Sequence, residues 1–242
     1  MPPNWSAILR HNVWQYERLD RKQRERLDAW VRVFHAERNW EGCDGLELTD
    51  EIRVTIAGQA GLIVLGHEDW YFDRTPSILV YPDDYVARDV ARPAGGGLTI
   101  VGDESRLGEA WYRGPVILSW PDVLEGGQSS NGGHNLVIHE FAHQLDMIGD
   151  PEADGEPPMP DVETAEYWRE IVPEEFERLC RACGSGQPTL LDCYGASSPA
   201  EFFSVASEVF FQRPAALRVR HPQLYEAFRR FYRLDPEQWL GA

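Results

Sequence analysis

Two histidines four residues apart, with a glutamate directly after the first, lie in the stretch NLVIHEFAHQLDM, residues 135–147. If this stretch is helical, His139 and His143 lie about 40° apart around the helix axis and share one face. Two imidazoles at this spacing can bind one Zn²⁺ ion at about 2.0–2.1 Å. Glu140 lies at the edge of the same face, where it can hold a water molecule that the metal activates. The stretch therefore predicts a zinc site of the HExxH type.

A purely structural interpretation competes with the metal site. Two histidines on a helix that packs into the core can simply form hydrogen bonds, and three fixed letters can also arise by chance. Because the chain has only 7 His among 242 residues, the motif should occur by accident on the order of 0.02 times in such a chain. We therefore prefer the metal site.

A catalytic zinc ion needs a third protein ligand and an open coordination position. Asp146 lies on the same helix face, but it is close to His143 in sequence and its side chain is short, so orienting a ligand or the helix end suits it better. Glu201 and Glu208 lie on one face of a second predicted helix, within YGASSPAEFFSVASEVFF, residues 194–211. Either glutamate could be the third ligand or a surface carboxylate, and their spacing alone does not choose between them.

The elements that position these residues begin with helices. Residues 6–37 have apolar residues at helical spacing, which predicts one or two amphipathic helices. Residues 48–66 contain β-branched residues that would suit a strand. However, Thr49 followed by Asp50 and Glu51 is typical of a helix N-terminus, so we favour a helix here.

A small sheet and two loops are predicted in the middle of the chain. Three short apolar runs bounded by Gly or Pro predict strands at 77–82, 97–102 and 114–120. The segment 83–96 predicts a loop, and the Pro- and acid-rich segment 151–160 predicts another.

Helical spacing returns in the last third of the chain, at 164–183, 199–211 and 223–232. The order of helices, then a small sheet, then helices predicts an α+β fold. We expect one compact unit, in which an N-terminal helical segment, residues 1–45, packs on a catalytic domain, residues 46–242.

Composition excludes several classes of function. The formal net charge of −17 makes nucleic acid an unexpected partner, because neutralising phosphates requires clustered Lys and Arg. The same charge disfavours docking on anionic membranes, and the apolar runs are far too short to cross a membrane. The first residues lack a basic start followed by an apolar segment, so we expect no signal peptide and a cytoplasmic protein.

The cysteines predict no disulfide framework, since four in a chain of this length are too few. One pair has the C-x-x-C spacing of half a zinc site, but no second pair exists. We therefore expect buried free thiols rather than a metal or redox site. The residues are Cys43, Cys180, Cys183 and Cys193.

Several motifs taken together resemble the Mlc titration factor A family of bacterial cytosolic zinc peptidases. The resemblance extends from about residue 45 to residue 232, is most specific in the last two motifs, and is poor in the N-terminal helices. HEFAH followed by a later glutamate is also similar to the gluzincin pattern, and the family is distantly similar to the catalytic domain of anthrax lethal factor. The motifs are GLELTDEIRVTIA, ILVYP, GPVILSW, NLVIHEFAHQLDM and YGASSPAEFF.

The resemblance implies a fold and a set of roles. The fold is zincin-like α+β, with a small mixed sheet, the HExxH helix and a helical C-terminal part. One Zn²⁺ ion is held by His139, His143 and Glu201. Glu140 acts as the general base, and the hydroxyl of Tyr194 faces the zinc.

The resemblance also bears on the residues outside this set. It leaves Glu208 a supporting or structural role. It favours an edge strand at 114–120, along which an extended peptide could lie, whereas the residues alone favour an ordinary core strand.

Two functions are implied. The first is zinc-dependent hydrolysis of peptides or proteins, with aminopeptidase-like action on small peptides. The second is a regulatory binding protein that sequesters a glucose-related transcriptional repressor independently of catalysis. Replacing Glu140 would separate the two, because only hydrolysis needs a general base.

Overall fold

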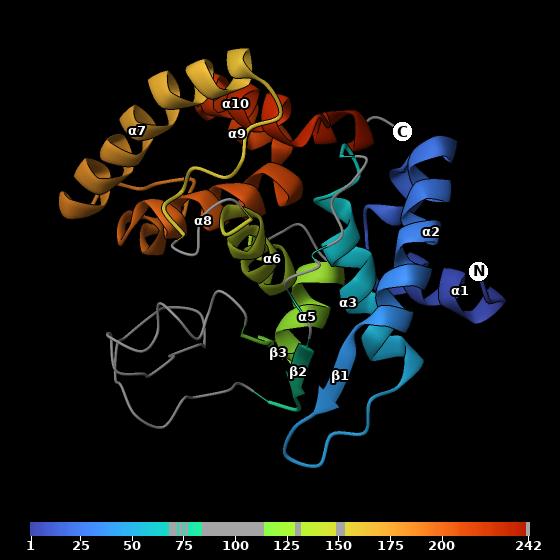
Figure 1. Cartoon of the computed structure of the whole chain (residues 1–242). Helices are drawn as coiled ribbons and strands as arrows, with labels where there is room; N and C mark the ends of the chain where they lie inside the picture. The colour runs from blue at the N-terminus through green and yellow to red at the C-terminus, as the bar shows by residue number, and fades with distance from the viewer. Residues whose placement is uncertain are drawn as a thin grey trace.

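The computed structural model describes residues 1–67, 72, 75, 77–83, 114–128, 132–148 and 153–240 (Figure 1). The predicted strand at 97–102, nearly all of the predicted loop at 83–96 and the start of the loop at 151–160 lie outside the described residues. The strands are β1 (Asn39–Gly42), β2 (Ser77–Tyr81) and β3 (Val116–Ser119). The short 3-10 helices are η1 (Tyr16–Arg18), η2 (Cys193–Ala196) and η3 (Pro236–Leu240). The α-helices are α1 (Pro3–Asn12), α2 (Arg21–Glu37), α3 (Asp50–Leu62), α5 (Trp120–Gln128), α6 (Leu136–Asp146), α7 (Val162–Gly184), α8 (Pro199–Gln212), α9 (Pro214–Arg220) and α10 (Pro222–Tyr232).

The predicted helices are confirmed. The ambiguous segment 48–66 forms α3, which begins where the side chain of Thr49 accepts a hydrogen bond from the backbone N–H of Ile52 (3.4 Å). The predicted helices of the last third correspond to α7, α8 and α10. The short elements β1 and α9 were not predicted, because each spans too few residues to show a clear period.

The three described strands form one parallel sheet in the order β1-β2-β3. Asn39 pairs with Ser77, and Ile78 pairs with Val116. The mixed sheet that we expected is therefore wrong for the described strands. The reason lies in the connection: α3 crosses over between β1 and β2, and a crossover returns the chain in the same direction. Among the described strands β3 lies at an edge, and it contacts α6.

The core is built around helices that are buried on nearly all sides. Every residue from 202 to 212 of α8 and from 54 to 62 of α3 is buried, as expected for helices that are apolar all round. α6 packs between them, against α8, α3 and β3 (Figure 1). Its apolar stripe of Val137, Phe141 and Leu145 is fully buried, which leaves the opposite face for the histidines.

Aromatic side chains join α8 to the C-terminal helices. The rings of Phe203 and Phe228 lie 5.8 Å apart, and Trp168 of α7 lies 5.1 Å from Phe228. Such contacts add to the free energy of burial because the rings interact edge to face or offset. These contacts hold α7, α8 and α10 together. As a result α8 packs against α7 and α10 as well as against α6.

The expectation of four free thiols is wrong. Cys183 at the end of α7 and Cys193 at the start of η2 form a disulfide, with Cα atoms 5.7 Å apart, whereas Cys43 and Cys180 are free. The pair is brought together by the turn that follows α7, which sequence spacing does not reveal.

None of the described helices combines the length and the apolar character that crossing a bilayer requires.

Candidate metal centre

The start of α6 is fixed by Asn135. Its side-chain oxygen accepts a hydrogen bond from the N–H of Ile138 (2.9 Å), and its side-chain amide donates to the carbonyl of Gly126 on α5 (3.0 Å). A capping residue of this kind satisfies a helical N–H that would otherwise lack a partner. Because the cap is also tied to α5, the rotation of α6 is set, and with it the direction of His139 and His143.

The start of α8 is fixed in a similar way. The hydroxyl of Ser198 accepts a hydrogen bond from the N–H of Glu201 (3.2 Å), and Pro199 occupies the first helical position. Glu201 therefore lies in the first turn, close to the point where the helix is anchored. Since α6 packs against α8, this turn faces the histidines.

Three of the predicted site residues converge. The Nε2 atoms of His139 and His143 lie 3.1 Å and 3.4 Å from the same Glu201 carboxylate oxygen, Oε2. One ligand atom from each residue lies within 4.8 Å of the others, so all three could contact a single ion. The side chains of both histidines and of Glu201 are partly exposed, at 14%, 14% and 20%. Each of these side chains therefore keeps some contact with solvent, which is compatible with an open coordination position.

A buried oxygen supports a cation at this place. Glu201 Oε2 is buried and has no hydrogen-bond partner among the described residues, although two imidazole nitrogens lie near it. A buried carboxylate oxygen needs a nearby positive charge, which protonated histidines supply in the metal-free protein and which a metal cation between the three atoms would supply when bound. Two imidazole nitrogens and one carboxylate oxygen form a donor set that zinc prefers.

The electrostatics of the site couple these groups. Burial would lower the pKa of His139, but the carboxylates of Glu201 and Glu208 outweigh it and hold that pKa well above its ordinary value. Burial would raise the pKa of Glu201, yet the two histidines outweigh it and lower that pKa. Burial raises the pKa of Glu140, against the attraction of both histidines.

Glu208 holds the far side of one histidine. Its Oε1 lies 2.7 Å from Nδ1 of His139, and its Oε2 accepts a hydrogen bond from the N–H of Asn135 (2.6 Å). The side chain is 6% exposed. It therefore turns Nε2 of His139 toward the other ligands and does not compete with Glu201 for the ligand position. The Nδ1 atom of His134 lies 3.8 Å from the same Oε2.

Asp146 lies away from the ligand position. It is buried, and its Oδ2 accepts a hydrogen bond from the N–H of Gly155 (2.8 Å). Gly155 has φ +81°, and a Cβ there would meet the carbonyl oxygen of Pro199 at 2.6 Å. Trp168 donates to the carbonyl of Gly155 (3.3 Å). Asp146 thus holds the loop after α6 against Pro199, the first residue of α8, two residues before the candidate ligand Glu201.

Tyr194 lies beside the cluster. Its ring centroid is 6.0 Å from that of His139, and the residue is 43% exposed. The turn that carries it is capped by Asp192, whose side chain accepts a hydrogen bond from the N–H of Tyr194 (2.8 Å). The ring of Tyr194 is therefore close to His139 and open to solvent.

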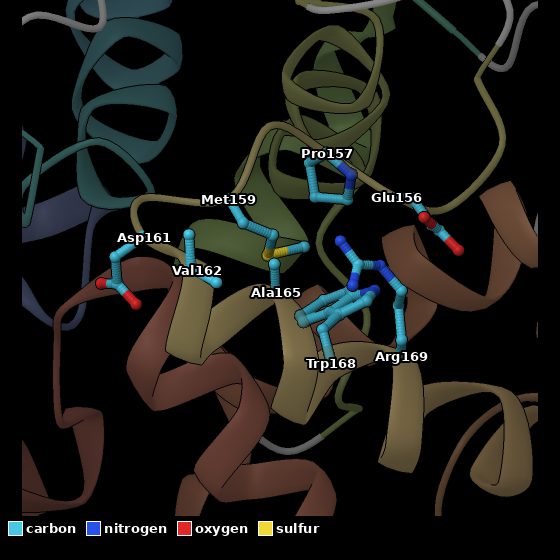
Figure 2. A pocket seen from close by; sticks show the side chains of 8 residues that line it. All are labelled: Glu156, Pro157, Met159, Asp161, Val162, Ala165, Trp168 and Arg169. Carbon is cyan, nitrogen blue, oxygen red and sulfur yellow. The ribbon is translucent and has the colours of Figure 1, made fainter.

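A separate hollow of about 400 Å³ lies between the loop at 153–161 and the first turns of α7 (Figure 2). Arg169 extends alongside Trp168 toward Pro157 in this view. The hollow contains none of the predicted ligands, so it is distinct from the metal centre. Its lining residues are Glu156, Pro157, Met159, Asp161, Val162, Ala165, Trp168 and Arg169.

Two supporting residues were missed by sequence analysis. Asn135 directly precedes the apolar period of α6, which is a recognised signal for a helix cap, so it could have been found. Gly155 gives no such signal, because the need for a glycine there arises only from the approach of Pro199.

Comparison with known proteins adds a family. A model of the glucose-regulated metallo-peptidase M90 family matches residues 1–233. An uncharacterized protein of Synechocystis is 37% identical over 239 residues, which cover 98% of this chain and 86% of that protein.

Two similar relatives carry the name Mlc titration factor A. The one from Edwardsiella ictaluri is 36% identical, over 90% of this chain and 83% of the relative. The one from Serratia proteamaculans is 34% identical, over 90% of this chain and 82% of the relative.

Replacing Glu208 tests its contact with His139. Glu208→Gln removes one of two acceptors, because an amide cannot accept from both His139 Nδ1 and the N–H of Asn135. We expect zinc affinity to fall roughly 10- to 100-fold, measured by competition with a chromogenic chelator. The exposed Glu166→Gln on α7 is the matched control. Equal affinities of the two variants for zinc would contradict an orienting role.

The buried carboxyl of Asp146 makes stability depend on pH. Burial raises its pKa to about 6, above the ~3.9 of an unfolded chain, so folding favours the protonated form. This contribution is present below about pH 4 and is lost as the pH rises to about 6. We expect the free energy of unfolding of metal-free Asp146→Asn to rise, relative to wild type, by roughly 1 kcal/mol between about pH 5 and about pH 8.

Urea unfolding at the two pH values measures this difference, and the exposed Asp83→Asn serves as the control. A difference between Asp146→Asn and wild type that stays constant with pH would show that Asp146 is ionised at both values.

Proposed function

This chain belongs to the glucose-regulated metallo-peptidase M90 family, and we propose that it hydrolyses peptide bonds with one zinc ion held by His139, His143 and Glu201. The proposal is carried by the approach of two imidazole Nε2 atoms to one buried carboxylate oxygen that has no hydrogen-bond partner. His, His and Glu suit zinc better than they suit magnesium or calcium, which prefer oxygen ligands.

The metal and Glu140 have complementary roles. When bound, the ion supplies a Lewis acid that polarises the scissile carbonyl and makes water nucleophilic near neutral pH. Glu140 is buried beside the ligands, and burial raises its pKa, which brings the carboxylate closer to the basicity that proton transfer at neutral pH requires. In this proposal it takes the proton from the attacking water and delivers it to the leaving amine.

In this proposal Tyr194 stabilises negative charge. As the carbonyl carbon becomes tetrahedral, charge develops on its oxygen, and a well-placed hydroxyl donor contributes roughly 3 kcal/mol to the transition state. The ring lies beside His139 on the exposed side of the site, which supports this role. Its hydroxyl would donate a hydrogen bond to the developing oxyanion.

The contact with Glu208 selects the tautomer of His139 that a ligand needs once the metal has displaced the proton from Nε2. A metal-binding imidazole must be neutral, with its proton on the nitrogen that faces away from the ion. Glu208 Oε1, at 2.7 Å from Nδ1, can accept that proton in a hydrogen bond. Nε2 is then free to bind.

The substrate in this proposal is an extended peptide lying along β3. This strand is at the edge of the described sheet and contacts α6, and an exposed strand edge can pair with a peptide backbone. The resemblance to the Mlc titration factor A family implies aminopeptidase-like action, so we extend the proposal to short peptides.

A second candidate function is binding of a transcriptional repressor, and the name of two relatives, Mlc titration factor A, favours it. Such binding would not need the metal site. The two functions can therefore coexist in one chain, and a variant without catalysis separates them.

Glu140→Gln tests the catalytic proposal. Glutamine keeps the shape of the side chain but cannot accept the proton, so kcat should fall roughly 10²- to 10⁴-fold. Bound zinc should stay the same, because Glu140 is not among the ligands. Chelation should abolish hydrolysis by wild type, and added zinc should restore it.

The exposed Glu125→Gln on α5 is the control. Hydrolysis by Glu140→Gln as fast as by wild type would rule out Glu140 as the base. Binding of an Mlc-type repressor to Glu140→Gln, measured by calorimetry, should be unchanged if the regulatory function is independent of catalysis.

A further inference from the structure

The disulfide between Cys183 and Cys193 lies next to a residue of the proposed site. Cys183 is in the last turn of α7, and Cys193 is the first residue of η2, directly before Tyr194. The crosslink therefore ties the turn that carries Tyr194 to the end of a long helix. Since α7 also packs on α8 and α10, the disulfide connects the turn that carries Tyr194 to the helices that position Glu201.

Beside the crosslink, the N–H groups of residues 185–187 donate hydrogen bonds back to carbonyls in the last turns of α7, and these bonds do not reach the turn that carries Tyr194. Residues 184–188 are exposed, and Gly186 has φ +69° with open space around it. Beyond the crosslink, Leu191 is buried, and Gly195 packs against Leu179 and Val205. The turn is thus held on one side by packing and on the other by the disulfide.

We propose that the Cys183–Cys193 disulfide positions Tyr194 beside the metal site, so that reducing it lowers turnover without releasing the ion. This inference rests on the proposed function, in which Tyr194 donates to the oxyanion. Closing a short loop removes conformational freedom from the connected segment, and that freedom includes movement of Tyr194 away from His139.

The crosslink is open to thiol exchange. Cys193 is exposed and Cys183 is half-buried. A thiolate of a dithiol reductant attacks the Cys193 sulfur and releases the Cys183 thiolate, which takes up a proton. The second thiol of the reductant then displaces Cys193, which leaves two protein thiols and one oxidised reductant.

The compartment gives this exchange a consequence. The sequence predicts a cytoplasmic protein, and disulfides of cytosolic proteins are usually transient, catalytic or redox-sensing. Whether the cysteines are oxidised or reduced would then depend on the reduction potential of the cytoplasm. The position of Tyr194 would in turn depend on whether the disulfide is formed.

Hydrogen exchange tests the positioning without using activity. The backbone N–H groups of Tyr194, Gly195 and Ser197 are hydrogen-bonded within the turn. In the zinc-loaded protein, reduction with dithiothreitol should make these amides exchange roughly tenfold faster. Peptide mapping before and after reduction verifies the Cys183–Cys193 link, and zinc content should stay constant. Unchanged exchange, or a map without the link, would overturn the inference.

Kinetics test the consequence for catalysis. Reduction, or the double substitution Cys183→Ser/Cys193→Ser, should lower kcat roughly tenfold with little change in KM, because a fully lost oxyanion donor costs about 10²- to 10³-fold. Cys43→Ser, which leaves the crosslink intact, is the matched control. In a Tyr194→Phe background the double substitution should have no further effect, since the group that it positions is absent.

The outcomes separate this inference from the proposed function. A fall in kcat of the same size in the Tyr194→Phe background, or a fall that follows loss of zinc, would show that the disulfide only supports the fold and would overturn the inference. Re-oxidation of reduced wild type should restore kcat, which avoids reliance on variants that fold poorly. If oxidised wild type hydrolyses no peptide while exchange still responds to reduction, the proposed function fails and the tether of the turn stands.

Discussion

Three atoms that could bind one metal ion, from His139, His143 and Glu201, lie close together at a partly buried place. They come from two packed helices, α6 and α8, and the rest of the fold holds these helices in position. A carboxylate oxygen removed from water without a hydrogen bond costs several kcal/mol unless a positive charge compensates it. Glu201 Oε2 is in this situation, with an imidazole nitrogen of His139 and one of His143 at 3.1 Å and 3.4 Å. The packing of α6 against α8 therefore holds the two imidazoles close to the Glu201 carboxylate.

The supporting contacts act on helix ends rather than on the ligands alone. Asn135 fixes the start of α6, and Glu208 reaches from α8 to both Asn135 and His139. At the other end of α6, Asp146 holds Gly155 against the start of α8. These hydrogen bonds fix the turns of α6 and α8 that carry His139 and Glu201, so the candidate ligands are held in position by the residues around them.

The helices and most of the candidate site residues could be predicted from local sequence patterns. The other features depend on how separate parts of the chain pack together. The spacing of His139 and His143 and the helical spacing of residues 199–211 were enough to predict two helices that carry candidate ligands. Spacing alone could not choose between Glu201 and Glu208, because they share a face, and only the geometry shows that Glu208 contacts the outer nitrogen of His139. The parallel sheet was missed because pairing between distant segments leaves no periodic trace. The Cys183–Cys193 link joins residues only 10 apart, and it was missed because the spacing does not show which way the chain turns after α7.

The chain belongs to a metallopeptidase family, and the central claim is that one ion occupies the place between His139, His143 and Glu201. Zinc-edge anomalous scattering from crystals of the purified protein tests it most directly. The account predicts one peak per chain at that place, with nitrogen and oxygen atoms at about 2.0–2.2 Å. The peak should be absent from crystals of a His143→Ala variant that remains folded. A peak elsewhere, or none in protein that hydrolyses peptides, would contradict the claim.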